Sequence, residues 1–190
     1  MTNRHFVFIE GSSRSEGNTA ALARRAQLHL PAGTSSEWIS LAELPLPDFE
    51  DPRSPGSTPP IYPDGNEGLL LAATLRATDL VIASPLYWYT ISAPVKRYLD
   101  YWSNWLKIPG LNFRRQMSQG ALWGITVGHT DDESKTEGLA TSLRFSAEYL
   151  GMQWGGLLYG SGGYPGEILQ DQNALQGAEQ FFARNLMPLG

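Results

Sequence analysis

Short apolar runs alternate with longer amphipathic segments along most of the chain. Apolar runs that predict β-strands occupy residues 5–9, 37–41, 79–84, 120–127 and 152–159. Apolar residues at helical spacing predict helices over residues 19–30, 67–77, 134–150 and 171–185, and a further helix is predicted to start near Ser92. Gly155 and Gly156 interrupt the last predicted strand, which indicates a β-bulge there.

The segment from residue 42 to residue 66 breaks this alternation. It holds seven prolines, namely Pro45, Pro47, Pro52, Pro55, Pro59, Pro60 and Pro63. Prolines at this density fit neither a helix nor a central strand, because each lacks a backbone N–H and has a fixed φ. We therefore expect a long surface excursion. The residues before it are too few to form a domain, so residues 1–190 are predicted to form a single domain.

Five strands joined by helical connections predict a parallel sheet, because neighbouring parallel strands need such crossovers and these are right-handed. Helices then cover both faces of the sheet and give a three-layer, doubly wound α/β fold. In such a sheet, the loops that follow strands one, three and four can converge on one crevice beside the point where the strand order reverses. These three loops are therefore the candidate ligand site.

The loop after the first strand is rich in hydroxyl groups. Its side-chain donors are Ser12, Ser13, Ser15 and Thr19. Gly11 and Gly17 allow the backbone to turn, Arg14 adds a positive charge, and Asn18 opens the helix that follows. Such a loop forms an anion site, because unpaired backbone N–H groups and the helix dipole both face the turn. The alternative is an ordinary strand-to-helix turn in which Ser and Asn residues act as caps.

Two features of this loop narrow the choice of anion. It lacks a Gly-Lys-Ser/Thr ending, so it differs from the loop that holds a nucleoside triphosphate with magnesium. Five residues separate Gly11 from Gly17, which excludes the Gly-x-Gly-x-x-Gly pattern of dinucleotide sites. Four hydroxyl groups in eight residues instead suit the several oxygens of a terminal phosphate monoester, such as that of FMN.

The loop after the third strand carries three consecutive aromatic residues, Tyr87, Trp88 and Tyr89, after Pro85 turns the chain. At the carboxyl end of a parallel strand, these rings are placed to stack on or border a flat heterocycle. The alternative is that they are packing or dimer-contact residues. Residues 128–130 form the corresponding loop after the fourth strand.

Composition and charge exclude several classes of protein. The chain has no cysteine, which excludes disulfides, thiol catalysis and cysteine-ligated zinc or iron–sulfur sites. His5, His29 and His129 show no metal-ligand spacing, and residues 131–133 are read as a solvated helix start. A formal net charge of -5 argues against a nucleic-acid binder with a broad basic face. No apolar run approaches membrane-spanning length and no signal-peptide pattern opens the chain, so we expect a cytoplasmic protein.

Two motifs resemble a known family. GSSRSEGNT at residues 11–19 and SPLYWYTISAPVKRYLD at residues 84–100 are similar to motifs of the flavodoxin-like NAD(P)H-dependent FMN reductases and quinone reductases. The resemblance assigns the phosphate-binding loop to Ser12, Arg14, Ser15, Gly17, Asn18 and Thr19, with Ser13 as a further hydroxyl donor beside them. It assigns the loop along the ribityl chain and the isoalloxazine edge to Pro85, Leu86, Tyr87, Trp88, Tyr89 and Thr90, and the third flavin loop to Gly128 and His129.

The resemblance also implies the flavodoxin-like strand order 2-1-3-4-5, a bound FMN and NAD(P)H as co-substrate. The implied chemistry is hydride transfer from NAD(P)H to the flavin, followed by reduction of a quinone, an azo or nitro compound, or free flavin. No acid or base of the protein is obligatory, because the flavin carries the redox chemistry. The alternatives are a flavodoxin-type electron carrier and a flavodoxin-fold interaction module without flavin. A carrier typically needs a strongly acidic docking face, and the mild net charge favours the enzyme.

Four aromatic residues, Tyr98, Tyr101, Trp102 and Trp105, fall on the helix that is predicted to start near Ser92. They offer more aromatic surface than one helix face can bury. This predicts an isologous homodimer across the helix, in which the partner helps to close the crevice. The alternative is that the proline-rich excursion folds over these rings.

Overall fold

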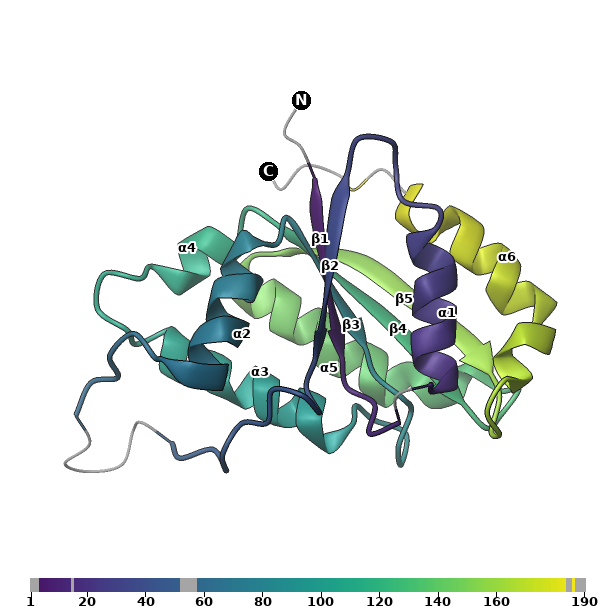
Figure 1. Cartoon of the computed structure of the whole chain (residues 1–190), viewed down its shortest axis with the longest axis horizontal. Helices are drawn as coiled ribbons and strands as arrows, with labels where there is room; N and C mark the ends of the chain where they lie inside the picture. Colours follow the sequence, from purple (N-terminus) through teal and green to yellow (C-terminus); the bar gives the residue numbers. More distant parts are fainter. Residues whose placement is uncertain (1–3, 15, 52–57, 184–185, 187–190) are drawn as a thin grey trace.

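The structure is a computed structural model that describes residues 4–14, 16–51, 58–183 and 186. Ser15, Pro52 and Pro55, together with residues 184 and 185 of the predicted last helix, lie outside the described residues. Figure 1 shows a twisted central sheet with helices on both sides of it.

All five strands of the sheet run parallel. They are β1 (His5–Glu10), β2 (Ser35–Ser40), β3 (Asp79–Ala83), β4 (Ala121–Gly128) and β5 (Gln153–Ser161). Their order across the sheet is β2-β1-β3-β4-β5. This confirms the predicted doubly wound α/β fold and the flavodoxin-like order, and each strand lies within two residues of its predicted bounds.

The predicted bulge in β5 is present. Leu122 of β4 pairs with Trp154, but the next residue, Trp123, pairs with Gly156, so Gly155 is left without a partner in the ladder. A Cβ atom on Gly155 would lie 2.2 Å from the Trp123 ring. Glycine is therefore required here because the indole occupies the space that a side chain would fill.

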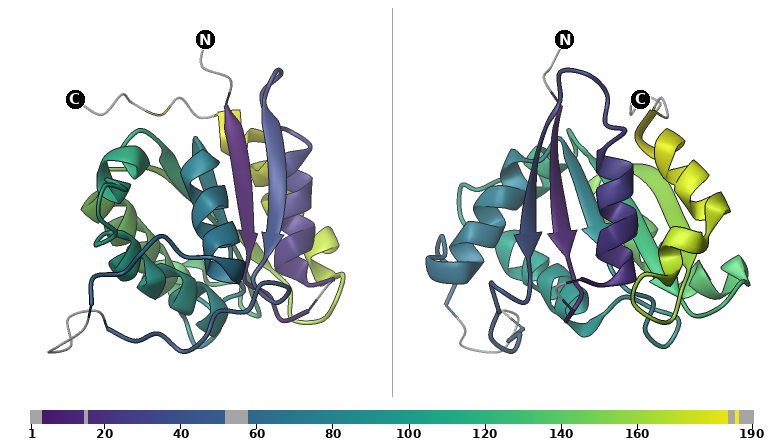
Figure 2. Two further views of the ribbon diagram at one scale, coloured as in Figure 1. Left: turned by 60° about the vertical axis from the view of Figure 1, so that its left-hand side comes forward. Right: turned by 45° about the vertical axis from the view of Figure 1, so that its right-hand side comes forward.

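The helices form the two outer layers (Figure 1 and Figure 2). One face of the sheet is covered by α1 (Asn18–Gln27) and α6 (Gln172–Gln180), and the other by α2 (Gly65–Arg76), α3 (Ala93–Trp105), α4 (Phe113–Met117) and α5 (Glu137–Leu150). Side chains of β1 alternate between these layers: Phe6 and Phe8 belong to the core under α1 and α6, whereas Val7 and Ile9 belong to the other core.

Several helical details differ from the sequence-based expectations. The last helix, predicted over residues 171–185, is observed as α6 followed by the 3₁₀ turn Phe181–Ala183, and a further 3₁₀ turn, Glu167–Gln170, precedes it without having been predicted. The short helix α4 was not predicted, since its five residues are too few to show a helical period. The helix predicted from Ser134 starts as a 3₁₀ turn, Glu133–Thr136, before α5. The first helix, predicted to reach Leu30, ends at Gln27. The N–H groups of His29 and Leu30 bond to carbonyls three residues back, and Pro31 follows, which disfavours helical backbone before it.

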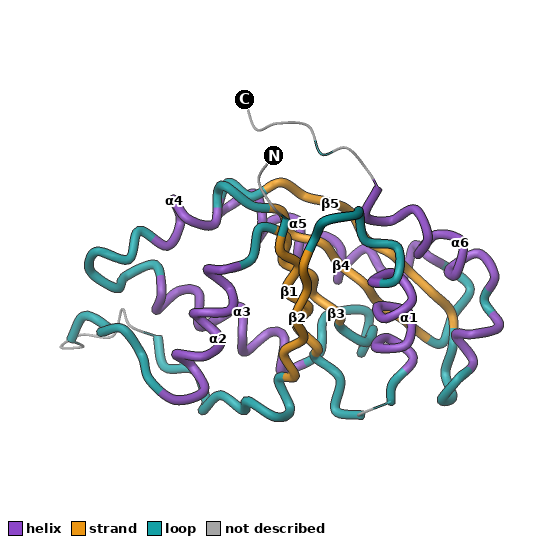
Figure 3. The backbone as a smooth tube through the Cα atoms, turned by 45° about the horizontal axis from the view of Figure 1, so that its top comes forward, coloured by secondary structure: helices purple, strands orange, loops and turns teal. Residues whose placement is uncertain are grey.

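The aromatic residues of α3 are buried within the chain itself, which removes the surface on which the dimer prediction relied. Figure 3 shows that the described parts of the connection between β2 and α2 lie on the same side of the molecule as α3. The Tyr101 hydroxyl donates to the Pro47 carbonyl over 3.3 Å, and the Phe49 ring packs against Tyr101. Arg97 donates to the Leu46 carbonyl over 2.9 Å. The excursion thus covers Tyr101, as the alternative proposed. Tyr98 and Trp105 bond instead to Thr74 and Glu67 of α2, and Trp102 packs against Phe113 of α4.

At the amino ends of the central strands, Asp79 is a buried hydrogen-bonding centre. Its side chain is 3% exposed. It accepts hydrogen bonds from Arg4 Nε at 2.9 Å, from Thr78 Oγ1 at 2.9 Å and from Trp123 Nε1 at 2.9 Å. Trp123 in turn packs edge-on against Phe181 and its neighbour in the last 3₁₀ turn, Phe181–Ala183. This carboxylate therefore joins β1, β3, β4 and the end of the described chain.

Replacing Glu67 by glutamine is expected to stabilise the fold at neutral pH. Glu67 Oε1 accepts a hydrogen bond from Trp105 Nε1 over 2.9 Å, and burial raises the pKa of this carboxyl above its ordinary value. A raised folded-state pKa means that stability is fully present below the unfolded pKa and is lost as pH rises through the folded pKa. Glutamine keeps the acceptor for Trp105 without a charge. Urea unfolding at pH 4 and pH 7 should show a gain for the variant that appears only at the higher pH.

The matched control is Glu137→Gln, which alters an exposed glutamate in the first turn of α5 and should give no such pH-dependent gain. An equal gain for Glu67→Gln at both pH values would contradict the role of burial.

Candidate functional site

A crevice of about 250 Å³ lies at the carboxyl ends of the strands. The predicted site residues that line it are Ser12, Arg14, Gly17, Asn18, Thr19, Pro85, Leu86, Tyr87, Gly128 and His129. The loops after β1, β3 and β4 thus meet at one place. Val127, Gly162 and Gly163 complete the lining, and the last two come from the connection after β5.

Four of the residues named from the sequence do not line this crevice: the exposed Ser13, and Trp88, Tyr89 and Thr90 of the aromatic turn. Ser15 lies outside the described residues. The structure therefore brings together most of the predicted set and places the tip of the aromatic loop outside the hollow.

The hydroxyl-rich loop is held tightly against the start of α3. Gly11 N–H donates to the Ala83 carbonyl over 2.9 Å, and the Ser92 hydroxyl donates to the Gly11 carbonyl over 2.7 Å. A Cβ atom on Gly11 would lie 2.2 Å from Val95 Cγ2, so only glycine allows this close approach. Ser92 N–H also donates to Ser84 Oγ over 2.9 Å. These contacts fix the loop after β1 relative to the loop after β3.

The amino end of α1 faces the crevice and provides its anion-binding features. The helix follows Gly17, which has extended backbone, and within the described residues no side chain caps this end. Its first backbone N–H groups have no partner inside the helix, and the helix dipole adds positive potential. The hydroxyl residues Ser12 and Thr19 are buried beside it, and Arg14 is the cation among the described lining residues. This set suits a phosphate dianion.

The aromatic loop forms a tight turn with two left-handed residues. Tyr87 and Thr90 exchange two backbone hydrogen bonds of 3.1 Å, and the residues between them, Trp88 and Tyr89, have φ values of 48° and 62°. Positive φ at both central positions defines a type I′ turn, for which Asn-Gly is the usual sequence. Large side chains here cost conformational energy, and Trp88 is 92% exposed. Such strain at the edge of a crevice is typical of a functional segment.

The connection after β5 is the part of the site that was missed from the sequence. Gly162 and Gly163 line the crevice, and the ring of His129 packs directly on Gly163, where a Cβ atom would lie 2.2 Å from Nδ1. The signal that was available is the glycine-rich run at residues 160–166, which directly follows a predicted strand.

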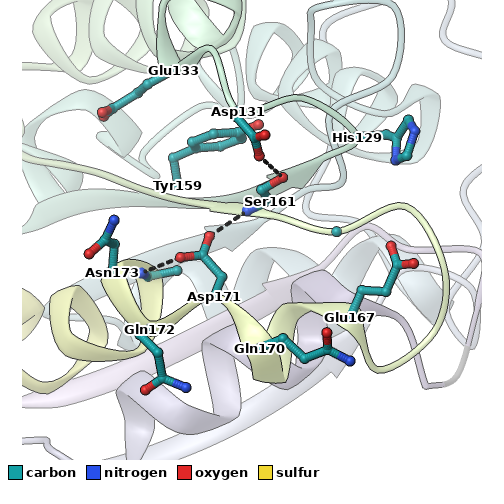
Figure 4. A pocket seen from close by; sticks show the side chains of 12 residues that line it. His129, Asp131, Glu133, Tyr159, Ser161, Glu167, Gln170, Asp171, Gln172 and Asn173 are labelled. Atoms are coloured by element: carbon teal, nitrogen blue, oxygen red, sulfur yellow. Dashed lines mark hydrogen bonds between the residues drawn. The ribbon is translucent and has the colours of Figure 1, made fainter.

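A second, larger hollow of about 790 Å³ adjoins the crevice and shares His129 and Gly162 with it (Figure 4). Its carboxylates mainly hold the chain in place: Asp171 accepts from Ser161 N–H over 2.8 Å, and the Ser161 hydroxyl donates to Asp131 over 2.8 Å. Among the described residues, no group of three or more His, Cys, Asp or Glu side chains is arranged to hold a metal ion. This hollow is therefore best described as a structural border of the crevice.

Tyr159, which lines the same hollow, remains protonated at neutral pH. Its hydroxyl donates to the Thr130 carbonyl, and burial raises its pKa to about 12, with Asp131 and Asp171 acting in the same direction. The side chain therefore anchors the loop after β4 and does not serve as a base.

The sequence model of the NADPH-dependent FMN reductases matches residues 5–152 of the chain. The chain belongs to this family. The reductase is therefore an NAD(P)H-dependent oxidoreductase that uses FMN.

Individual relatives agree with this assignment. YwqN of Bacillus subtilis, whose name describes an NAD(P)H-dependent FMN-containing oxidoreductase, is 33% identical to the reductase over 181 residues, which are 93% of this chain and 96% of YwqN. The FMN-dependent NADH:quinone oxidoreductase of Kineococcus radiotolerans is 36% identical over 120 residues, covering 56% of this chain and 55% of that protein. The solved structure of the Trp repressor binding protein from Bacillus subtilis has a TM-score of 0.75 and 28% identity, covering 95% of this chain and 99% of that one.

The residues of the crevice fit FMN. The uncapped end of α1, Arg14 and the buried hydroxyls suit the terminal phosphate, and the apolar Leu86 and Val127 with Tyr87 suit a flat ring system.

None of the helices in the described ranges is long and apolar enough to span a bilayer.

Proposed function

We propose that this reductase binds FMN in the crevice and uses it to pass reducing equivalents from NAD(P)H to a small aromatic electron acceptor, namely a quinone, an azo or nitro compound, or free flavin. FMN held in the crevice would supply the hydride-transfer chemistry between the nicotinamide and the second substrate. The observation that carries the proposal is the convergence of an uncapped helix end, Arg14 and two buried hydroxyls with an apolar wall in one hollow.

The residues of the chain have binding and orienting roles in this proposal. Arg14 and the backbone N–H groups of α1 neutralise the phosphate, and the hydroxyls of Ser12 and Thr19 orient it. Leu86 and Tyr87 provide an apolar border that excludes water from one edge of the ring.

The acceptor is assigned from the rim of the crevice. Trp88 and Tyr89 are exposed on the strained turn next to the lining residue Tyr87. Aromatic rings at this position favour flat, uncharged acceptors that stack on them. The quinone activity in the name of the Kineococcus relative supports a quinone as the first acceptor to test.

The homodimer and the cytoplasmic location stay predictions. Because the aromatic rings of α3 are buried within the chain itself, a dimer would have to use another surface.

The experiment that tests the function follows the visible flavin band of the purified protein without oxygen. We expect added FMN to bind with a shifted spectrum, NAD(P)H to bleach it, and a quinone to restore it. Binding without bleaching would indicate the electron carrier instead, and no binding at excess FMN would reject the flavin site.

A further inference from the structure

The side-chain amide of Asn18 makes three hydrogen bonds, all of them to backbone groups of the segment after β5. Its Nδ2 donates to the Gly162 carbonyl over 3.1 Å and to the Tyr164 carbonyl over 2.7 Å. Its Oδ1 accepts from Gly166 N–H over 2.8 Å. An asparagine amide has only two N–H donors, so neither is left for an anion in the crevice.

The segment that Asn18 holds, residues 162–166, is called the 162–166 loop below. It is also anchored from its other side, because Glu167 Oε2 accepts from Gly163 N–H at 2.8 Å and from Tyr164 N–H at 2.9 Å. These two backbone bonds lower the pKa of Glu167, which keeps the carboxylate ionised as an acceptor. Figure 4 shows Glu167 and His129 on the two sides of this loop.

The position of the 162–166 loop determines the shape of the crevice. Gly162 and Gly163 line the crevice directly, and His129, which also lines it, packs on Gly163. A shift of the loop would therefore move three lining residues together. Glycines alone set no fixed conformation, because they sample many backbone angles, so the loop depends on its outside contacts for order.

We propose that Asn18 is a positioning residue. Its hydrogen bonds form a latch that holds the 162–166 loop against the start of α1 and thereby fixes the side of the flavin crevice that this loop lines. On this proposal Asn18 is not a ligand of the flavin phosphate. The inference rests on the proposed function for its flavin-binding consequence. The latch itself is a property of the protein without ligand.

Riboflavin separates the two roles, because it has the ring and ribityl chain of FMN but no phosphate. For Asn18→Ala we expect the Kd values of FMN and riboflavin, from flavin fluorescence titration, to rise by the same factor, about tenfold. We also expect faster deuterium uptake by the 162–166 loop in the ligand-free chain, without a rise through the sheet. Asn18→Asp keeps the acceptor for Gly166 but loses both donors, so its riboflavin affinity should lie between those of the wild type and Asn18→Ala.

The matched control is Asn173→Ala, which removes an exposed asparagine on α6 that borders the neighbouring hollow. It should change neither Kd nor the deuterium uptake. A weaker Kd for FMN alone would overturn the proposal and make Asn18 a phosphate ligand. Unchanged uptake by the loop in Asn18→Ala, or a uniform rise over the whole chain, would also overturn it. If the wild type binds neither flavin, the proposed function fails, while the uptake measurement still decides the latch.

Discussion

Replacing Asp79 by alanine is expected to lower the free energy of unfolding by about 3–5 kcal/mol, the range found when one partner of a buried ion pair is removed. Asp79 is almost fully buried, and its oxygens accept from Arg4, Thr78 and Trp123. Alanine would leave the Trp123 N–H in the core without an acceptor and Arg4 without its counter-ion. Urea unfolding followed by circular dichroism measures the loss.

The control for Asp79 is a second Asp–Arg pair on the surface. Asp48 accepts from Arg97 over 2.7 Å, but the Asp48 side chain is 94% exposed. Exposed pairs of this kind contribute roughly 0–1 kcal/mol, so Asp48→Ala should have a small effect. If the two substitutions cost the same free energy, the account of Asp79 as a buried junction of the strands is wrong.

Replacing Arg14 by alanine is expected to weaken FMN binding by roughly tenfold to a hundredfold, which corresponds to the loss of a hydrogen bond to a charged group. Riboflavin binding should stay close to that of the wild type, because riboflavin has no phosphate to neutralise. The affinity difference between wild type and variant should shrink as salt is added, since Arg14 is exposed and its field is screened. Fluorescence titration at low and high salt measures both effects.

Arg115→Ala provides the comparison for Arg14, because it removes the same charge from α4, away from the lining of the crevice. It should leave both flavin affinities unchanged. A parallel loss of FMN and riboflavin affinity in Arg14→Ala would indicate damage to the loop and not the loss of a phosphate contact. Arg14 and Asn18 thus occupy neighbouring positions but should give opposite riboflavin results.

The fold was predictable largely because its three central strands, β1, β3 and β4, are buried on both faces. The apolar run in β3, Asp79–Ala83, follows its first residue without a break. A run this short, with turn residues at its ends, is typical of a buried strand and is too short for most helices. The bulge at Gly155 was also visible, since two adjacent glycines weaken a strand. By contrast, the single turn of α4 leaves no periodic signal, and its formation depends on packing of Phe113 against the rings of α3.

Much of the crevice was predictable from the topology of the sheet, because loops at the carboxyl ends of central parallel strands must lie near one another. The glycine-rich run after β5 marked a further loop at the same edge of the sheet. How closely the 162–166 loop approaches the crevice was not predictable, because that depends on hydrogen bonds between Asn18 and residues far along the chain. The burial of Tyr101 could not be read from the sequence either. Counting aromatic residues on a helix does not reveal that Phe49 and Pro47 will cover this ring.

The latch between Asn18 and the 162–166 loop also has a consequence for how the protein is made. The hydrogen bond from Gly166 to Asn18 joins residues 148 positions apart, so it forms only after nearly all of the chain has been synthesised. A nascent chain that ends before β5 already has its phosphate loop, but it lacks the segment that closes the crevice. Contacts between such distant segments form late, because the entropy of closing a long loop must first be overcome. On the proposed function, a chain that ends before β5 should therefore bind FMN more weakly than the full chain.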